Sequence, residues 1–433
     1  MRYILYVFIA VFLSACAQKP IPKIQETPSD LLEVNQSVTA YLDTINERNI
    51  SSLEAFEKHY FNLWNIKKID ISKKEAMWAY RSFRVGNSYG ENLQPLKQSF
   101  FDDIYARSNF AAYSSLNKPA ITLKALNIRA FPTDKPLLMD PKKAGEGFPF
   151  DYMQNSLIAP NKPILVSHYS RDKEWVFIEA SFAYGWVKAR DIAFIPKAYA
   201  KLYQEAEKEF VIKESHPIYD AQGNFLFRSR IGMLLPEIKE NNASYTVLSI
   251  GNYKNNEAFY IRSTIPKSVL HKGILEFNVK NIAMIFQEVS AVKYGWGGMY
   301  QQRDCSSILR DFFAPFGLWL PRNSYEQSKL GKVISLEGLS DTQKLQLIKE
   351  KAVPFETLLY KKGHILLFVG VKNGEPIVFH ATWGIKTKKD EKEGRFIIGK
   401  PIFSTLELGS NLKDYDKNAS ILTQLKSMNI LTQ

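Results

Sequence analysis

The spacing of apolar residues divides the chain into a helical part, a strand-rich part and a mixed part. Residues 31 to about 117 place apolar side chains at helical intervals, as in the run from Phe56 to Trp64. From Ala120 the pattern changes to short alternating runs, such as Pro163–Ser167 and Glu174–Glu179, separated by glycine and proline. After about 275, helical and strand patterns follow one another again. We therefore expect a multidomain α+β chain.

Two strand-rich segments stand in the middle of the chain, over 118–196 and 197–274. In the first, Leu126–Pro132 and Tyr184–Val187 resemble the opening and closing signatures of bacterial SH3-like domains. The second contains short runs such as Tyr245–Ile250 and would be another small barrel of the same type. We thus expect a helical N-terminal domain over 31–117, two SH3-like β-barrels, and a C-terminal domain over 275–433.

The first residues have the three-part pattern of a secretory signal. A positive start at Arg2 precedes the apolar stretch Ile4–Leu13, and the small residues Ser14 and Ala15 follow. This stretch of about ten residues is too short to span a hydrocarbon core, which needs about twenty. We expect the signal to cover residues 1–15.

The segment Leu13–Cys16 resembles the lipobox of bacterial lipoproteins. The resemblance implies that Cys16 is lipidated, becomes the mature N-terminus and anchors the protein in a membrane. Ala17, rather than aspartate, implies the outer membrane, facing the periplasm. An ordinary cleaved signal with a chance cysteine is the alternative. Residues 16–30, rich in proline and charge, are expected to form a flexible tether.

Composition and charge narrow the classes of partner. The chain has 433 residues, 45% of them hydrophobic, which is enough for three or four domains. Its net charge of +13 suits anionic wall polymer or lipid headgroups outside the cytoplasm. The sequence contains no zinc-finger spacing, phosphate-binding glycine loop or basic-aromatic RNA motif, so we expect no nucleic-acid partner.

The candidate chemistry lies in the C-terminal domain, where Cys305 is the only cysteine besides Cys16. Apolar residues at helical spacing from Ile308 to Phe316, followed by Gly317, predict a helix that starts near Cys305. The dipole and free N–H groups at such a start favour a reactive thiolate. A lone cysteine is more often a buried apolar residue. The polar neighbours Arg303, Asp304, Ser306 and Ser307 favour a nucleophile here.

Two histidines are predicted to lie on one β-hairpin in this domain. A strand begins at His364, Asn373-Gly374 signals a two-residue turn, and His380 lies on the returning strand. His364 would act as general base, and His380 would orient its ring. Strict pairing around the turn places His380 opposite Leu367, facing away from His364. A bulge or longer loop must therefore shift the register if both serve Cys305.

These motifs resemble those of the NlpC family of bacterial cell-wall cysteine peptidases. The resemblance covers 275–433 and rests on four features in order: Tyr294-x-Trp-Gly-Gly, Asp-Cys-Ser at 304–306, Gly-His at 363–364, and His380. It implies a papain-like core with a helix on an antiparallel sheet and no cofactor or metal. The implied reaction is hydrolysis of the bond between γ-D-glutamate and a diamino acid, usually diaminopimelate, in peptidoglycan stem peptides.

The resemblance also implies a role for each matching residue. Cys305 would be the nucleophile, His364 the base, His380 the orienting residue, and the Tyr294 hydroxyl a donor to the oxyanion. Asp304 and Ser306 match positions that hold the free amino end of the stem peptide. Arg303 could hold a substrate carboxylate, an expectation from its chemistry alone. Ser307 replaces a usual glycine, and Tyr300–Gln302 departs from the usual glycine-rich run, which affects only substrate details.

Other functions remain open at the level of sequence. The same core could transfer an acyl group to an amine or lipid, or cleave proteins generally. The SH3-like domains could instead serve a non-catalytic wall-binding lipoprotein. Cys305, His364 and His380 could also form a catalytic zinc site, although a thiol at a helix start favours a nucleophile. If a neighbouring domain closes the groove, only free peptides with an N-terminal alanine will fit.

Overall fold

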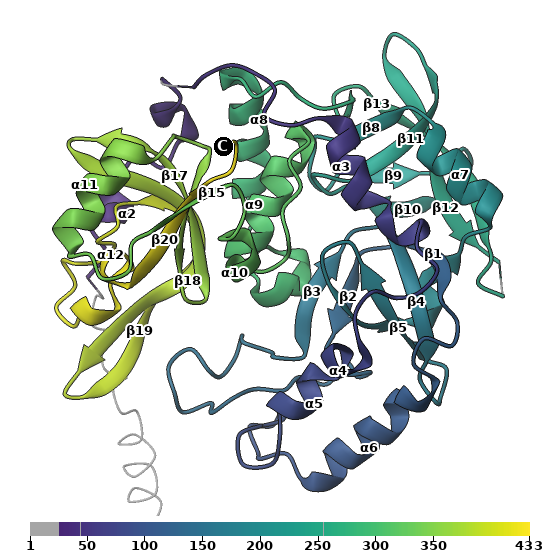
Figure 1. The fold of residues 1–433 in the computed structure, drawn as a ribbon, viewed down its shortest axis with the longest axis horizontal. Coiled ribbons are helices and arrows are strands. Elements are labelled where there is room, and N and C mark those ends of the chain that lie inside the picture. The colour runs from purple at the N-terminus through teal and green to yellow at the C-terminus, as the bar shows by residue number, and fades with distance from the viewer. Residues whose placement is uncertain (1–25, 44, 254) are drawn as a thin grey trace, which may run out of the picture.

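The computed structural model describes residues 26–43, 45–253 and 255–433. In Figure 1, the C-terminal sheet lies on the left, two long helices stand in the middle, and two smaller β-domains lie on the right. The predicted signal, Cys16 and most of the predicted tether fall outside the described residues. Within the described ranges, no helix has the length and apolar character needed to cross a membrane.

The N-terminal part is made of short helices, as the periodicity predicts. The longer ones are α3 (Leu53–Tyr60) and α6 (Gln98–Ser108), and the short ones are α2 (Asp30–Glu33), α4 (Lys73–Ala76) and α5 (Trp78–Ser82). Ser52 caps α3 by accepting a hydrogen bond from the backbone N–H of Ala55. The helix packs Phe56 against Phe210 of the second β-domain, with ring centroids 5.1 Å apart.

The end of the predicted tether does not behave as a tether. The Asp30 side chain is buried and accepts hydrogen bonds from the backbone N–H groups of Thr405 and Gly409. Tyr41 stacks on Phe403 of the C-terminal domain, with ring centroids 5.0 Å apart. Residues 26–41 therefore belong in packing terms to the C-terminal domain, and the prediction of a flexible segment up to residue 30 is wrong at that end.

The first β-domain has one seven-stranded sheet in the order β3-β2-β6-β5-β4-β1-β7. Its strands are β1 (Lys118–Thr122), β2 (Leu126–Arg129), β3 (Gln154–Ile158), β4 (Pro163–Tyr169), β5 (Trp175–Ala180), β6 (Tyr184–Lys188) and β7 (Ile192–Phe194). The long connection between β2 and β3 reaches toward the C-terminal sheet (Figure 1). It brings residues of this domain to the candidate site described below.

The second β-domain follows helix α7 (Lys197–Glu205). Five strands pair in the order β13-β12-β11-β8-β14, and β9 and β10 form a separate hairpin. The strands are β8 (Lys208–Val211), β9 (Pro217–Tyr219), β10 (Phe225–Arg228), β11 (Leu234–Glu240), β12 (Ser244–Asn252), β13 (Ala258–Pro266) and β14 (Leu270–Lys272).

The C-terminal domain has a six-stranded antiparallel sheet in the order β15-β20-β16-β17-β18-β19. Its strands are β15 (Lys332–Ser335), β16 (Thr357–Lys361), β17 (His364–Lys372), β18 (Glu375–Lys389), β19 (Lys392–Ser404) and β20 (Leu425–Ile430). Helices α8 (Val279–Ser290) and α9 (Cys305–Phe313) share one core cluster with the sheet. Helices α11 (Asp341–Lys351) and α12 (Ile421–Gln424) contribute to another. A helix packed on an antiparallel sheet is the arrangement that the family resemblance implies for this domain.

Candidate active site

Helix α9 begins at Cys305, as its apolar spacing predicts. Asp304 is the N-cap: its carboxylate accepts the backbone N–H of Ser307, and the Ser307 hydroxyl accepts the backbone N–H of Asp304. After the helix, Gly317 has a φ of 77°, a left-handed conformation that favours glycine. Eight of the nine helical residues are buried, which fixes the helix, and with it Cys305, against the sheet.

The environment of the thiol differs from the sequence prediction. Cys305 is 8% exposed, and burial, together with the neighbouring Asp304 carboxylate, raises the pKa of the thiol to about 12. The backbone of Ile365 and the helix start act in the opposite direction but are outweighed. The expectation that the helix start favours a thiolate is therefore wrong for the resting site, because with this pKa the cysteine is a neutral thiol at neutral pH.

A bulge in the hairpin places the two histidines on one face. Near the turn, Lys372 pairs with Glu375 and Gly370 with Ile377, but beyond the irregularity Leu367 pairs with Phe379. The extra residue in β17 shifts the register by one, so the side chains of β17 beyond the bulge lie on the opposite face relative to those of β18. The Nε2 atom of His364 consequently lies 2.8 Å from the Nδ1 atom of His380. The predicted need for a register shift is confirmed.

Hydrogen bonds assign the proton on each ring. The Ser404 hydroxyl donates its only hydrogen to the carbonyl of Thr405 at 2.8 Å, so it accepts from the Nε2–H of His380 at 3.1 Å. The Nδ1 atom of His380 then accepts the Nε2–H of His364. The Nδ1 atom of His364 is left with a lone pair, as a general base requires. Sequence reasoning missed Ser404, because a lone serine at a strand end carries no signal.

Both imidazoles are neutral in this setting. Burial, followed by the positive charge of Lys361, lowers the pKa of His364 to about 3. Burial and the two neighbours His364 and Lys361 also lower the pKa of His380. The site at rest therefore holds a neutral thiol and neutral imidazoles rather than an ion pair.

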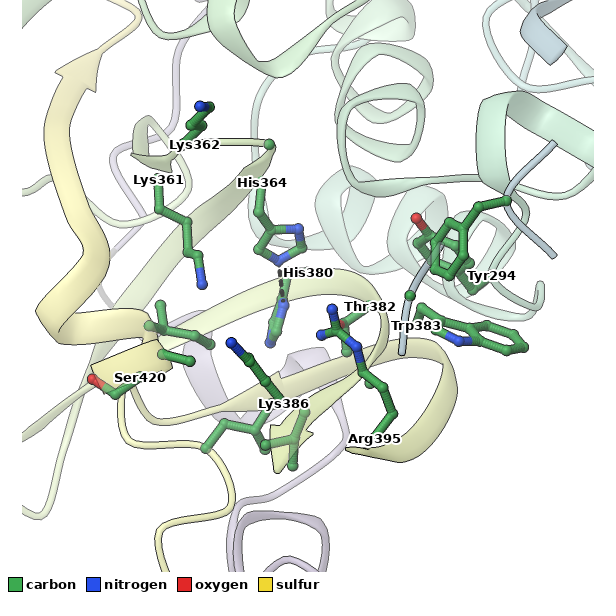
Figure 2. A pocket seen from close by; sticks show the side chains of 18 of the residues that line it. Tyr294, Lys361, Lys362, His364, His380, Thr382, Trp383, Lys386, Arg395 and Ser420 are labelled. Atoms are coloured by element: carbon green, nitrogen blue, oxygen red, sulfur yellow. Dashed lines mark hydrogen bonds between the residues drawn. The ribbon is translucent and has the colours of Figure 1, made fainter. Parts of the chain in front are cut away.

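A pocket of about 360 Å³ opens beside these histidines (Figure 2). Tyr294, His364 and His380 line it, and burial raises the pKa of the Tyr294 hydroxyl, with the nearby Asp304 carboxylate adding to the shift. Cys305 itself does not line the pocket. The backbone of Ile365, the residue after His364, acts to lower the pKa of its thiol, and no hydrogen bond joins the thiol to His364 within the described chain. The structure thus brings three predicted residues into one pocket and places the fourth beside it.

The first β-domain forms one side of this pocket. Phe150 packs edge-on against Trp296 and Trp383, with ring centroids 5.2 and 6.0 Å apart. A Cβ atom at Gly145 would lie 2.6 Å from a guanidinium nitrogen of Arg395, so the loop backbone lies directly against β19. Both loop residues line the pocket. The pocket is therefore shared between two domains.

Asp304 and Ser306 are already engaged by another side chain. Arg322 approaches both carboxylate oxygens of Asp304, at 2.6 and 3.2 Å, and donates to the Ser306 hydroxyl at 2.9 Å. It also donates to Ser156 of the first β-domain at 2.7 Å. Sequence reasoning missed Arg322, which lies on the loop after α9 without a recognisable motif. An ammonium group at Asp304 would have to share the carboxylate with this guanidinium.

The domains match known family models in the order in which they occur. Residues 5–113 match the model described as the NLPC_P60 stabilising domain, 136–188 an SH3 domain of the SH3b1 type, and 210–241 an SH3 domain of the SH3b2 type. Residues 291–393, which include Tyr294, Cys305, His364 and His380, match the NlpC/P60 family model. The C-terminal domain is an NlpC/P60 domain. This family indicates a cysteine peptidase of the bacterial cell wall with a peptidoglycan-derived substrate.

Two solved structures are similar to this chain to different degrees. A protein described as a novel NlpC/P60 endopeptidase from Photobacterium damselae subsp. piscicida is 23% identical, with a TM-score of 0.81, over 92% of this chain and 98% of that one. An NlpC/P60 family protein from Bacillus cereus is 14% identical, with a TM-score of 0.45, over 73% of this chain and 100% of that one. No curated protein matches this sequence.

Arg303 does not lie in the pocket of the NlpC/P60 domain. Its side chain is 0% exposed and donates to Glu214 of the second SH3 domain at 2.8 Å and to Asp311 of α9 at 2.9 Å. Arg230 of the second SH3 domain also pairs with Asp311, at 3.0 Å. The prediction that Arg303 holds a substrate carboxylate is wrong, because its charge is used to fix the NlpC/P60 domain to its neighbour.

Other candidate ligands do not gather into a further site. In the ranges that the structure describes, no group of three or more His, Cys, Asp or Glu side chains could hold a metal ion. His168 is a core residue of the first SH3 domain, bonded to Ser167 and to the carbonyl of Ser108, and burial lowers its pKa to about 4. His59 stacks on Trp319 with centroids 4.4 Å apart.

Proposed function

We propose that this protein hydrolyses the bond between γ-D-glutamate and a diamino acid, usually diaminopimelate, in peptidoglycan stem peptides. The observation that carries the proposal is the hydrogen-bonded series from His364 through His380 to Ser404, set beside a cysteine that starts a helix in an NlpC/P60 domain. The series leaves the Nδ1 atom of His364 free to accept a proton.

In the proposed mechanism, Cys305 attacks the γ-carbonyl carbon while His364 takes the thiol proton. Proton transfer accompanies attack, because the resting thiol is neutral. This step requires the Cys305 sulfur to reach the Nδ1 atom of His364. The imidazolium that forms keeps its hydrogen bond to the Nδ1 atom of His380, which holds the ring in place, as the third residue of a triad does.

The developing oxyanion would be held by the Tyr294 hydroxyl and by backbone N–H groups at the start of α9. His364 then gives its proton to the leaving amine, and the C–N bond breaks to leave a thioester on Cys305. Water, deprotonated by His364, attacks the thioester, and release of the acid restores the thiol. No cofactor is needed for these steps.

Asp304 and Ser306 are proposed to serve the amino end of the stem peptide together with Arg322. Their contacts to that guanidinium keep both groups ordered before substrate arrives. The loop residues Gly145 and Phe150 reduce the space on one side of the pocket. We therefore propose short, free stem peptides as substrates, which would suit trimming or recycling more than cleavage of intact wall.

We also propose that the mature protein is attached by lipid at Cys16 to the outer membrane, facing the periplasm. The support is the lipobox-like sequence alone, which lies outside the described residues. Substituting Cys16 by Ser and fractionating cells tests it: we expect the protein to leave the membrane fraction, and unchanged membrane association would contradict the anchor.

The activity is tested with the protein lacking residues 1–16, incubated with purified peptidoglycan and with L-Ala-γ-D-Glu-diaminopimelate. Mass spectrometry should show L-Ala-γ-D-Glu released from the free peptide and none with the Cys305→Ala variant. Efficient cleavage of intact wall would overturn the preference for short peptides. Absence of product from both substrates would overturn the peptidase proposal and favour a wall-binding role.

A further inference from the structure

One wall of the pocket is strongly basic. Four of its lining residues carry positive charge, and among the described residues that line it there is no aspartate or glutamate; the four are Lys361, Lys362, Lys386 and Arg395. Figure 2 shows the charged ends of Lys361, Lys386 and Arg395 pointing toward one another, next to the bonded pair His364 and His380.

Three of these four cations have no carboxylate partner among the described residues; Lys361 and Arg395 point into the cluster, and Lys362 points away from it (Figure 2). Lys386 pairs with Glu393 at 2.5 Å and with Asp416 at 3.6 Å. In contrast, no described carboxylate lies within 4.0 Å of the charged nitrogens of Lys361 or Arg395. Like charges that converge in a partly buried place repel each other, so an anion bound between them would be stabilised by both.

The position of the basic wall identifies which part of a substrate it would meet. In the proposed mechanism His364 gives a proton to the leaving amine, so the leaving residue must lie next to His364. Lys361 acts electrostatically on both His364 and His380 and therefore lies close to them. Burial, followed by the charge of Arg395, lowers the pKa of Lys361, and Figure 2 shows Arg395 in the same part of the pocket.

The leaving residue carries a side-chain carboxylate only in one class of stem peptide, whereas an α-carboxylate is common to both classes. Diaminopimelate has a second carboxylate at the far end of its side chain, whereas lysine ends in an ammonium group alone. Between cations, this carboxylate gains charge-assisted hydrogen bonds and offsets the ammonium group beside it, while the lysine ammonium brings its positive charge without a carboxylate.

We infer that Lys361 and Arg395 bind the side-chain carboxylate of the leaving diamino acid and thereby select diaminopimelate over lysine. This inference rests on the proposed function. It assigns specificity to two residues that the family motifs do not include, and it names the class of stem peptide that the site accepts.

The test compares kcat/KM on three peptides that differ only at the third residue: diaminopimelate, diaminopimelate amidated at its side-chain carboxyl, and lysine. We expect the wild type to cleave the free diaminopimelate peptide about 100-fold better than the other two. Arg395→Met and Lys361→Met should each lower that rate about 10- to 100-fold, the range for a hydrogen bond to a charged group. Removing the Lys361 charge also acts on His364, so for each variant we compare the rate on the free diaminopimelate peptide with the rates on the other two, and we expect this ratio to fall toward one.

Lys389→Met serves as a matched control, because Lys389 is an exposed residue of β18 that does not line the pocket. It should cleave all three peptides at wild-type rates. Thermal melts of the variants show whether any loss comes from misfolding. Rescue by Arg395→Lys, which keeps the charge, would support charge recognition.

The outcomes separate this inference from the proposed function. Equal wild-type rates on all three peptides would overturn the inference while leaving the peptidase intact. No cleavage of any peptide would overturn the proposed function and the inference with it. A second measurement uses the Cys305→Ala protein in calorimetry: at least ten-fold tighter binding of the diaminopimelate peptide is expected, and equal affinities would overturn the inference without any turnover.

Discussion

Replacing Arg303 by Met should destabilise the protein without removing a substrate contact. Arg303 lies at the junction of the NlpC/P60 domain and the second SH3 domain, where its buried guanidinium donates to Glu214 and Asp311. Met has a similar length and is apolar, so it fills much of the space but leaves both carboxylates without this donor. The substitution thus distinguishes a structural role from the substrate-binding role that sequence reasoning assigned.

The expected loss in the free energy of unfolding depends on which partners Asp311 and Glu214 keep after the substitution. Breaking a buried ion pair by removing one partner costs about 3–5 kcal/mol. Asp311 keeps Arg230 at 3.0 Å and Arg310 at 3.1 Å, while Glu214 keeps the backbone N–H of Ile231 at 3.0 Å and a 4.0 Å approach from Arg230. We therefore expect a loss near the lower end, about 3 kcal/mol. For a cooperative unit of 150–250 residues this corresponds to a Tm lower by roughly 6–12 °C.

The assay combines a calorimetric melt with peptide kinetics at 20 °C, well below the melt. Lys329→Met is the matched control, because Lys329 forms an exposed pair with Glu326, and such pairs contribute about 0–1 kcal/mol. We expect the control to melt within about 4 °C of the wild type. A KM raised ten-fold in Arg303→Met, with an unchanged Tm, would refute our reasoning and restore Arg303 as a substrate ligand.

Three further predictions concern ionisation and hydrogen bonding. Because the pKa of Cys305 is raised to about 12, iodoacetamide should alkylate this thiol more than 100-fold more slowly than free cysteine at pH 7.5. The alkylation rate should still be rising with pH at pH 9. An alkylation rate that levels off near pH 5 would contradict the neutral thiol. Ser404→Ala removes the acceptor that fixes the His380 tautomer and leaves a buried donor unsatisfied, which costs about 1–3 kcal/mol. We therefore expect kcat to fall about ten-fold or more with KM unchanged. A wild-type kcat would exclude that role for Ser404. Burial acts to raise the pKa of Asp311, but three guanidinium groups hold it well below its ordinary value. The contribution of Asp311 to stability is therefore present above the unfolded pKa of about 3.9 and is lost as the pH falls below that value. Asp311→Asn should flatten the acid side of a plot of Tm against pH, and a curve parallel to that of the wild type would contradict the coupling.

Local patterns predict the elements that carry the candidate site. The apolar spacing after Cys305 predicts α9, and Asn373-Gly374 predicts the hairpin, because both depend on residues close together in the chain. The bulge can also be predicted, by counting residue pairs outward from the turn, because His364 and His380 can share a face only if the register shifts. These predictions need no knowledge of distant contacts.

Features that depend on distant contacts could not be predicted in this way. Arg303 has the chemistry of a carboxylate ligand, but Glu214 from another domain occupies it. A helix start favours a thiolate, but the burial of Cys305 beside Asp304 outweighs that effect. The loop around Phe150 reaches the pocket from a domain that ends about one hundred residues before Cys305 in the chain. The partner of Arg303, the protonation of Cys305 and the position of the loop all depend on tertiary packing. The spacing of apolar residues along the chain carries no information about such packing.

The central claim is that Cys305 attacks the γ-D-glutamyl carbonyl, and trapping the acyl-enzyme tests it most directly. The protein is mixed with L-Ala-γ-D-Glu-diaminopimelate, quenched in acid within the first turnover, digested and analysed by mass spectrometry. We predict an L-Ala-γ-D-Glu thioester on the peptide that contains Cys305, and neither adduct nor product with Cys305→Ala. Product formation at the wild-type rate by Cys305→Ala would contradict the account.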